Sequence, residues 1–188
     1  MKNKVIKTLI ILVVIFPIVV SAREIEKIEL VKCIDGDTAI FKIGKEKEKV
    51  RFLAINTPEY NEEKEEYYGK EASKYTCKRL TNAKKIEIEY DKKSDKRDRY
   101  GRVLGWIFVD DVLLQESLVK KGYAEIKYVY DNYSYVEILE KRERQAKKKE
   151  IGIWSSNKEK ESTKEKKNGI LNYFKDIFKK IRKKILEK

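Results

Sequence analysis

Alternation of apolar and polar residues is the pattern that most limits how this chain can fold. It runs through residues 24–34, 38–43 and 50–55, and the last two segments are joined by the charged sequence GKEKEK. A period of two puts the apolar side chains on one face of a β-strand, so the pattern predicts strands and a hairpin. Residues 86–90 and 103–109 have the same character, which brings the number of short strands to five.

Three helices are expected among these strands, over residues 70–80, over residues 113–121, and from a capping box at Ser134 and Glu137 to about residue 149. Gly122 stands where a left-handed C-cap ends the second helix. Five strands and three helices predict an α+β protein, namely an OB-type five-stranded, partly open β-barrel with helices on its outside.

Residues 1–22 have the composition of an export signal. Three lysines precede an apolar run from Thr8 to Val20, and small residues favour cleavage after Ala22. The run is shorter than the roughly 20 residues that span a bilayer, although an uncleaved anchor is the alternative. We therefore expect a secreted or cell-surface protein whose folded domain occupies residues 23–154.

The distribution of charge separates this domain from the C-terminal segment of the chain. Residues 23–154 carry 30 basic and 27 acidic side chains, whereas residues 155–188 hold more than half of the net charge of +13. Residues 155–168 lack apolar side chains and predict a charged linker. Residues 169–188 predict a basic amphipathic helix, which could lie on an anionic membrane surface, contact nucleic-acid phosphates or pack on its own domain.

Cysteine and histidine usage restricts the chemistry. The chain has no histidine and only two cysteines, which excludes a zinc site of the Cys/His kind and a histidine general base. Any metal would be a hard cation with oxygen ligands. Cys33 and Cys77 form either a disulfide or two small buried thiols, and the sequence alone favours the thiols.

Two acidic turns, DGDT and NTPE, each come directly after a predicted strand. Asp37 in the first turn offers a carboxylate, Asn56 in the second offers an amide oxygen, and the carbonyl of Thr57 precedes a proline that leaves strand pairing. Hard cations bind oxygen atoms of these kinds. Residues of these types are also common in ordinary turns that have no function. The pattern therefore leaves open whether the two turns form one site.

Glu59, Arg51 and Arg102 are the candidates for catalysis. Phosphodiester hydrolysis needs positive charge to offset the growing charge on the phosphate, and a carboxylate to accept a proton from water or to orient it. Arginine suits the first task because its planar fork meets two phosphate oxygens together. The alternation of strand 50–55 puts Arg51 on the side of Asn56 only if the strand twists or bulges.

The sequences IDGDT, RFLAINTPE, YGKEAS, AKKIEIEYD, DRYGR and IGIW occur in this order. Together they resemble the staphylococcal nuclease (thermonuclease) family of secreted, Ca²⁺-dependent nucleases, over roughly Lys27 to Trp154. The family fold is an OB-type five-stranded barrel with three helices, which agrees with the strands and helices that the pattern predicts.

The resemblance implies a calcium site. Asp37 would be the carboxylate ligand, Thr57 would give its backbone carbonyl, and Asp35 would act from outside the ligand shell. The chain departs from the family at Asn56, where well-known members have a second aspartate ligand. A neutral amide can still coordinate Ca²⁺, but we expect weaker binding from one ligand charge fewer.

The resemblance also implies roles in catalysis and substrate binding. Glu59 would be the base, Arg51 and Arg102 would hold the scissile phosphate, and Tyr128 and Tyr130 would flank the terminal nucleotide. The family cleaves DNA and RNA and leaves 3′-phosphates.

Three functions remain in view. The first is an exported, monomeric, Ca²⁺-dependent nuclease with little sequence specificity. The second is a non-catalytic OB-type module that binds single-stranded nucleic acid through its tyrosines and basic groups. The third is a surface-attached factor in which the helix at residues 169–188 has the main role.

Overall fold

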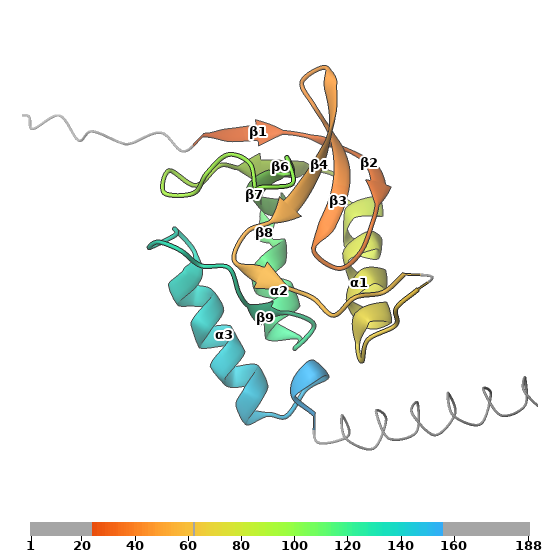
Figure 1. The fold of residues 1–188 in the computed structure, drawn as a ribbon, viewed down its shortest axis with the longest axis vertical. Helices are drawn as coiled ribbons and strands as arrows, with labels where there is room; N and C mark the ends of the chain where they lie inside the picture. The colour runs from red at the N-terminus through yellow and green to blue at the C-terminus, as the bar shows by residue number, and fades with distance from the viewer. Residues whose placement is uncertain (1–23, 62, 156–188) are drawn as a thin grey trace, which may run out of the picture.

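Strands and helices succeed one another in the order expected for an α+β protein. The computed structural model describes residues 24–61 and 63–155. Its elements are β1 (Ile25–Lys27), β2 (Glu29–Cys33), β3 (Thr38–Ile43), β4 (Glu46–Phe52), β5 (Ile55–Asn56), α1 (Gly69–Thr81), β6 (Ile86–Glu89), β7 (Val103–Val109), β8 (Val112–Leu113), α2 (Leu114–Lys120), β9 (Glu125–Ile126), α3 (Val136–Lys148) and the short 3₁₀ helix η1 (Gly152–Trp154). The predicted fold class, an OB-type barrel with three helices, is confirmed (Figure 1).

The barrel closes because one bent strand pairs with both edges of the sheet. The strand order is β1-β6-β7-β4-β3-β2, with β4 and β7 parallel and the other neighbours antiparallel. The buried Ile28 separates β1 from β2 and donates its N–H to the carbonyl of Ile86 at 3.0 Å. The strand predicted over 24–34 is therefore present, with a bend at Ile28 that lets its two halves meet different partners.

The strand predicted over 50–55 is divided in two. β4 ends at Phe52, Leu53 and Ala54 form a turn, and β5 then leaves the barrel to pair with β9. Ala54 has a φ of 60°, a left-handed conformation that strand alternation does not foresee. This turn sets the direction in which the residues after β4 leave the barrel.

The helices pack around the lower half of the barrel in the view of Figure 1, with α2 between α1 and α3. The fully buried side chain of Gln115 joins α2 to β7, because it accepts a hydrogen bond from the Ile107 N–H at 3.1 Å and donates one to the Gly105 carbonyl at 3.0 Å. Gln115 thus gives the Ile107 N–H a buried partner, while the Gly105 carbonyl also accepts the Leu53 N–H at 3.1 Å. The predicted stop at Gly122 is confirmed, with a φ of +66°.

The predicted capping box at the start of α3 is wrong. The helix begins at Val136, and its N-cap residue Tyr135 makes no side-chain capping bond. Ser134 lies outside the helix, because its backbone N–H donates to the carboxylate of Asp91 at 2.7 Å. Tertiary contact with the end of β6 therefore replaces the local cap.

The favoured prediction for the cysteines is also wrong. Cys33 at the end of β2 and Cys77 in α1 form a disulfide, with Cα atoms 5.6 Å apart. The two are separated by 44 positions in sequence, so only the packing of α1 beside β2 brings them together.

The predictions for the two ends of the chain fall outside the described residues. They are the export signal at 1–22, almost all of the linker at 155–168 and the basic helix at 169–188. They stay predictions, as do the boundaries of the domain at residues 23 and 154. Within the described part of the chain, no helix combines the length and the apolar character that crossing a membrane requires.

Candidate active site

The turn between β2 and β3 is held from three sides. Within it, the N–H of Asp37 donates to Asp35 Oδ1 at 3.0 Å. From α1, the hydroxyl of Thr76 donates to the carbonyl of Gly36 at 2.7 Å. A Cβ atom on Gly36 would lie 2.6 Å from Thr57 Oγ1, so only glycine lets the two acidic turns approach this closely.

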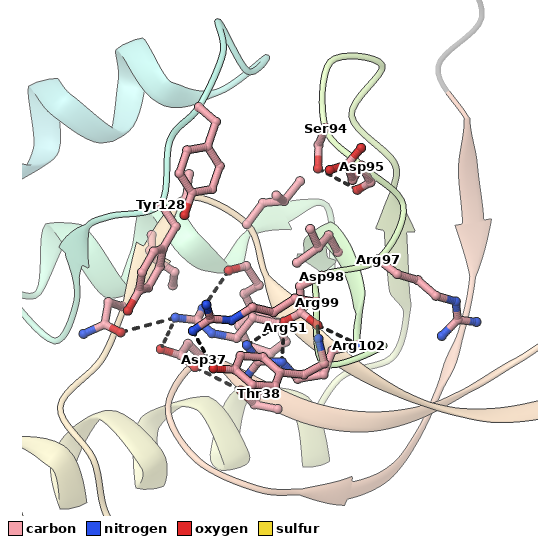
Figure 2. A pocket seen from close by; sticks show the side chains of 18 of the residues that line it. Asp37, Thr38, Arg51, Ser94, Asp95, Arg97, Asp98, Arg99, Arg102 and Tyr128 are labelled. Carbon is pink, nitrogen blue, oxygen red and sulfur yellow. Dashed lines mark hydrogen bonds and ion pairs between the residues drawn. The ribbon is translucent and has the colours of Figure 1, made fainter.

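Asp37 and Arg51 form a buried ion pair at the base of the site (Figure 2). Arg51 Nη2 lies 3.1 Å from Asp37 Oδ2. Arg51 is 7% exposed and Asp37 is 5% exposed. Arg51 Nη1 also donates to the Phe52 carbonyl at 2.9 Å. A buried pair of this kind is tolerated because hydrogen bonds satisfy its remaining donors and acceptors.

The turn at Ala54 removes the difficulty that alternation raised for Arg51. Arg51 Nη2 donates to Asn56 Oδ1 at 3.4 Å, so both side chains face the same site although five positions separate them. The twist or bulge that Arg51 needs in order to face the side of Asn56 is therefore present, as the turn between β4 and β5.

Thr57 binds Asp37 through two donors. Its backbone N–H donates to Asp37 Oδ2 at 2.7 Å, and its hydroxyl lies 3.2 Å from the same oxygen. Asp37 Oδ1 in turn accepts the hydroxyl of Thr38 at 3.0 Å. The two acidic turns, which are 20 positions apart, are thus joined through one carboxylate.

Glu59 is exposed, and its backbone is fixed by the loop between β5 and α1. Its N–H donates to Glu66 Oε2 at 2.8 Å, and its carbonyl accepts the N–H of Glu66 at 2.9 Å. Glu59 lines the same cavity as Asp37, on a backbone that these two bonds hold.

Arg102 starts from the opposite wall, at the beginning of β7. Its Nε and Nη2 both lie 2.6 Å from Asp98 Oδ2, and its backbone N–H donates to Asp98 Oδ1 at 3.0 Å. Its guanidinium also lies 5.4 Å from the ring centre of Tyr100. Asp98 therefore fixes one edge of the guanidinium and leaves the other edge available.

Aromatic side chains form the open rim. Tyr128 is 51% exposed and Tyr130 is 82% exposed, so both rings are accessible to a ligand in the cavity that they line. The guanidinium of Arg51 lies 5.8 Å from the centre of the Tyr128 ring. The ring of Tyr128 thus connects the open rim with Arg51 at the base of the site.

One open cavity of about 490 Å³ contains most of the predicted site. Its lining includes the predicted site residues Asp35, Asp37, Arg51, Asn56, Glu59, Arg102, Tyr128 and Tyr130. Thr57 is not part of the lining and lies behind Asp37, which it contacts. Figure 2 shows Asp37, Arg51 and Arg102 gathered on one side, with the guanidinium of Arg97 directed away from them.

The electrostatics of the site favour a cation. Burial raises the pKa of Asp35 to about 6, and the nearby charges of Asp37 and Glu59 add to this effect. Three carboxylates therefore repel one another, with Arg51 as the partly compensating charge. A bound cation would relieve this repulsion.

The donor set fits a hard cation in kind. Asp37 and Asn56 line the cavity with oxygen atoms, and the backbone of Thr57 adjoins them. No group of three acidic, histidine or cysteine side chains poised to hold a metal occurs among residues 24–61 and 63–155. A cation here would have one carboxylate ligand, Asp37, and would compete with Arg51 for its Oδ2 atom. Its further ligands would be oxygen atoms of water or of the substrate.

Sequence reasoning missed Asp98 and Glu125. Asp98 is the first residue of the sequence DRYGR, so its spacing of four from Arg102 was a usable signal. Glu125 accepts a hydrogen bond from Asn56 Nδ2 at 3.4 Å. It lies in β9, a strand of two residues, which is too short for a periodic pattern to indicate.

Comparison with known proteins adds a family match and several relatives. A model of the family described as staphylococcal nuclease homologue matches residues 49–156. The chain is 38% identical over 138 residues to the SPbeta prophage-derived endonuclease YokF of Bacillus subtilis. The matched region covers 72% of this chain and 46% of that protein. It is 37% identical over 130 residues to the thermonuclease of Staphylococcus hyicus, covering 68% of this chain and 75% of that protein.

A second Bacillus subtilis relative, endonuclease YncB, is 37% identical over 138 residues. These residues are 72% of this chain and 64% of that protein. The chain thus matches about half to two thirds of the length of the two Bacillus relatives.

Proposed function

This chain belongs to the staphylococcal nuclease homologue family, and we propose that it is a Ca²⁺-dependent nuclease that hydrolyses DNA and RNA with little sequence specificity and leaves 3′-phosphates. The observation that carries the proposal is that Asp37, Glu59 and the two arginines line one cavity. Side chains up to 65 positions apart in sequence meet there, and together they form the set that phosphodiester hydrolysis needs.

The arginines bind and stabilise the phosphate. Arg51 extends from β4 and Arg102 from the position just before β7, so their charges can meet the phosphate from two sides. Their guanidinium groups offset the charge that develops as the water oxygen bonds to phosphorus and the bond to the 5′ oxygen breaks. Glu59 accepts the proton that the attacking water loses, and the departing 5′ oxygen takes up a proton from solvent.

Asp37, Asn56 and Thr57 are the residues that would hold the calcium ion, with Asp35 close behind Asp37. When bound, a divalent cation supplies positive charge beside the phosphate and so stabilises the transition state. The contacts of Asp37 with Thr57 and Arg51 keep its carboxylate in place before the cation arrives.

Two features support the proposed lack of sequence specificity. Phosphate contacts carry no sequence information, and an exposed tyrosine can stack on any base. Tyr128 and Tyr130 at the rim would thus position the nucleotide next to the scissile phosphate whatever its base.

Export to an oxidising compartment is part of the proposal. It is supported by the signal pattern of residues 1–22 and by the disulfide between Cys33 and Cys77, since disulfides persist outside the reducing cytosol. Attachment to a membrane surface through residues 169–188 and a monomeric state stay predictions.

A non-catalytic module that binds single-stranded nucleic acid is the second candidate. It is favoured by the exposed rings of Tyr100, Tyr128 and Tyr130 at the cavity and by the neutral Asn56 at the cation site. Such a module would not need Glu59, which allows the two functions to be separated by experiment.

The test uses the purified protein with plasmid DNA and with RNA, with and without a calcium chelator, beside the variant Glu59→Gln. We expect chelator-sensitive cleavage, lowered roughly 100- to 10,000-fold by Glu59→Gln because a base is lost. Glu140→Gln is the matched control, since Glu140 is exposed on α3 and pairs with Arg144 outside the cavity. Retarded but intact nucleic acid in every sample would overturn the nuclease and favour the binding module.

A further inference from the structure

Asn56 has a partner that the sequence did not suggest. β5 and β9 form an antiparallel pair in which Asn56 stands directly opposite Glu125. Across this pair, Asn56 Nδ2 donates to Glu125 Oε1 at 3.4 Å, while Asn56 Oδ1 accepts from Arg51 Nη2 at 3.4 Å. The amide of Asn56 thus lies between a carboxylate and a guanidinium.

These two neighbours leave the amide only one favourable orientation. A carboxylate only accepts hydrogen bonds and a guanidinium only donates them. The NH₂ group of Asn56 must therefore face Glu125, and its oxygen must face Arg51 and the cavity. In the flipped orientation two donors would meet at Arg51 and two acceptors at Glu125, which is unfavourable at both ends.

Glu125 is itself held in position. The ammonium of Lys127 lies 3.1 Å from Glu125 Oε1. The backbone next to Glu125 is fixed by two further bonds: the Lys127 N–H donates to the Ala54 carbonyl at 3.0 Å, and the Ile126 N–H donates to Glu143 Oε1 on α3 at 2.8 Å. α3 therefore supports the strand that carries Glu125.

The orientation of Asn56 matters for a cation. Only the amide oxygen has lone pairs for a metal, whereas the NH₂ group presents positively polarised hydrogens. An aspartate at this position would not need orienting, since both of its oxygens are equivalent. With asparagine at this position, cation binding depends on the neighbouring group that decides whether the amide oxygen or the NH₂ group points into the cavity.

We propose that Glu125 is a positioning residue that fixes the amide of Asn56 with its oxygen toward the calcium site. This inference rests on the proposed function, because it takes the ion bound in the site to be calcium. It assigns Glu125 no contact with substrate or with the reacting atoms.

The first test measures Ca²⁺ binding to the full chain by isothermal titration calorimetry. Glu125→Ala should weaken binding about tenfold, the lower end of what loss of a partner behind a ligand costs. Glu125→Gln should retain most of the affinity, because its amide oxygen can still accept from Asn56 Nδ2. Equal losses in both variants would mean that Glu125 acts by its charge, and would overturn the proposal.

The second test repeats Glu125→Ala in the Asn56→Asp background. There the substitution should leave Ca²⁺ affinity nearly unchanged, because an aspartate needs no orienting. A tenfold loss in this background as well would contradict the positioning role. Glu140→Ala is the control for the loss of one acidic charge, and thermal unfolding checks that each variant is folded.

A measurement without metal separates this inference from the proposed function. In ¹⁵N-labelled, metal-free protein, the side-chain NH₂ signals of Asn56 should shift on Glu125→Ala and stay in place on Glu140→Ala. If these signals shift but the wild-type protein binds no Ca²⁺, the calcium proposal fails and the contact stands. If wild type binds Ca²⁺ and the signals do not shift, the positioning role fails and the calcium proposal stands.

Discussion

Arg51 and Arg102, the two predicted site arginines, are each paired with an aspartate, and the two pairs differ in burial. Arg51 and Asp37 are almost inaccessible, whereas the side chains of Arg102 and Asp98 are 25% and 17% exposed. Burial raises the pKa of Asp98, but its hydrogen bonds from Arg102 and from the Tyr100 N–H outweigh this and hold the pKa below 3.8. Asp98 is therefore charged at neutral pH and keeps Arg102 directed into the cavity.

Replacing this arginine should lower activity without unfolding the protein. In Arg102→Lys a single ammonium replaces the planar fork that binds Asp98 by one edge and a phosphate by the other. We expect the rate of DNA cleavage to fall by roughly 100-fold, as when one preorganised donor to a transition state is lost. Arg144→Lys, an exposed pair with Glu140 on α3, should retain the wild-type rate, and equal rates in both variants would contradict the role of Arg102.

At the scale of elements, α1 anchors the turn that carries Asp37. Cys77 in α1 is bonded to Cys33 at the end of β2, and the neighbouring Thr76 donates to the carbonyl of Gly36. A covalent and a polar contact from adjacent positions of one helix thus hold both β2 and the acidic turn. The position of the helix is thereby coupled to the geometry of the site.

Loss of the disulfide should weaken the fold. Because the bond closes a loop over a sequence separation of 44, the chain-entropy relation gives a stabilisation of about 4 kcal/mol. We expect urea unfolding of the double variant Cys33→Ser with Cys77→Ser to show a free energy of unfolding lower by about this amount. Adding a reductant should lower the stability of the wild type toward that of the double variant, while leaving the variant unchanged; equal stability of the two oxidised proteins would contradict this.

At the scale of the whole molecule, Asp91 connects the barrel with the helical layer. Its carboxylate accepts the indole N–H of the buried Trp106 from β7 at 2.9 Å and the N–H of Ser134, just before α3, at 2.7 Å. Asp91 itself is 8% exposed. Burial raises its pKa, but the hydrogen bonds from Ser134, Lys93 and Trp106 outweigh this and hold the pKa below 3.8.

The sign of this shift predicts how stability depends on pH. A group whose pKa is lower in the folded state stabilises the fold above its unfolded pKa, here 3.8, and this contribution is lost as pH falls through the lower folded value. Asp91→Asn should therefore lower the free energy of unfolding by about 2 kcal/mol at pH 7.

The difference between wild type and Asp91→Asn should shrink as the pH falls below 3.8, because the protonated aspartate resembles asparagine. Urea unfolding at several pH values measures it. A difference that stays constant as the pH falls well below 3.8 would show that the charge of Asp91 is not responsible.

The pattern of the sequence was sufficient for the elements whose cause is local. Alternation predicted β3, β6 and β7, helical spacing predicted α1, and Gly122 ended α2 as expected. It failed at the start of α3, where the capping box is absent because Ser134 is bound by Asp91, and at the end of β4, where Ala54 adopts a left-handed conformation. Both failures come from contacts or turns that adjacent residues do not specify.

For the candidate site, the sequence determined the chemistry and the tertiary structure decided its geometry. The absence of histidine and the residues of the two acidic turns and of DRYGR restrict the site to arginines, carboxylates and a hard cation, since these properties belong to side chains wherever they lie. The convergence of these side chains, the disulfide and the pairing of Asn56 with Glu125 depend on contacts between distant segments. Local propensity carries no information about such contacts, because they form only when the barrel closes and α1 and β9 pack against it.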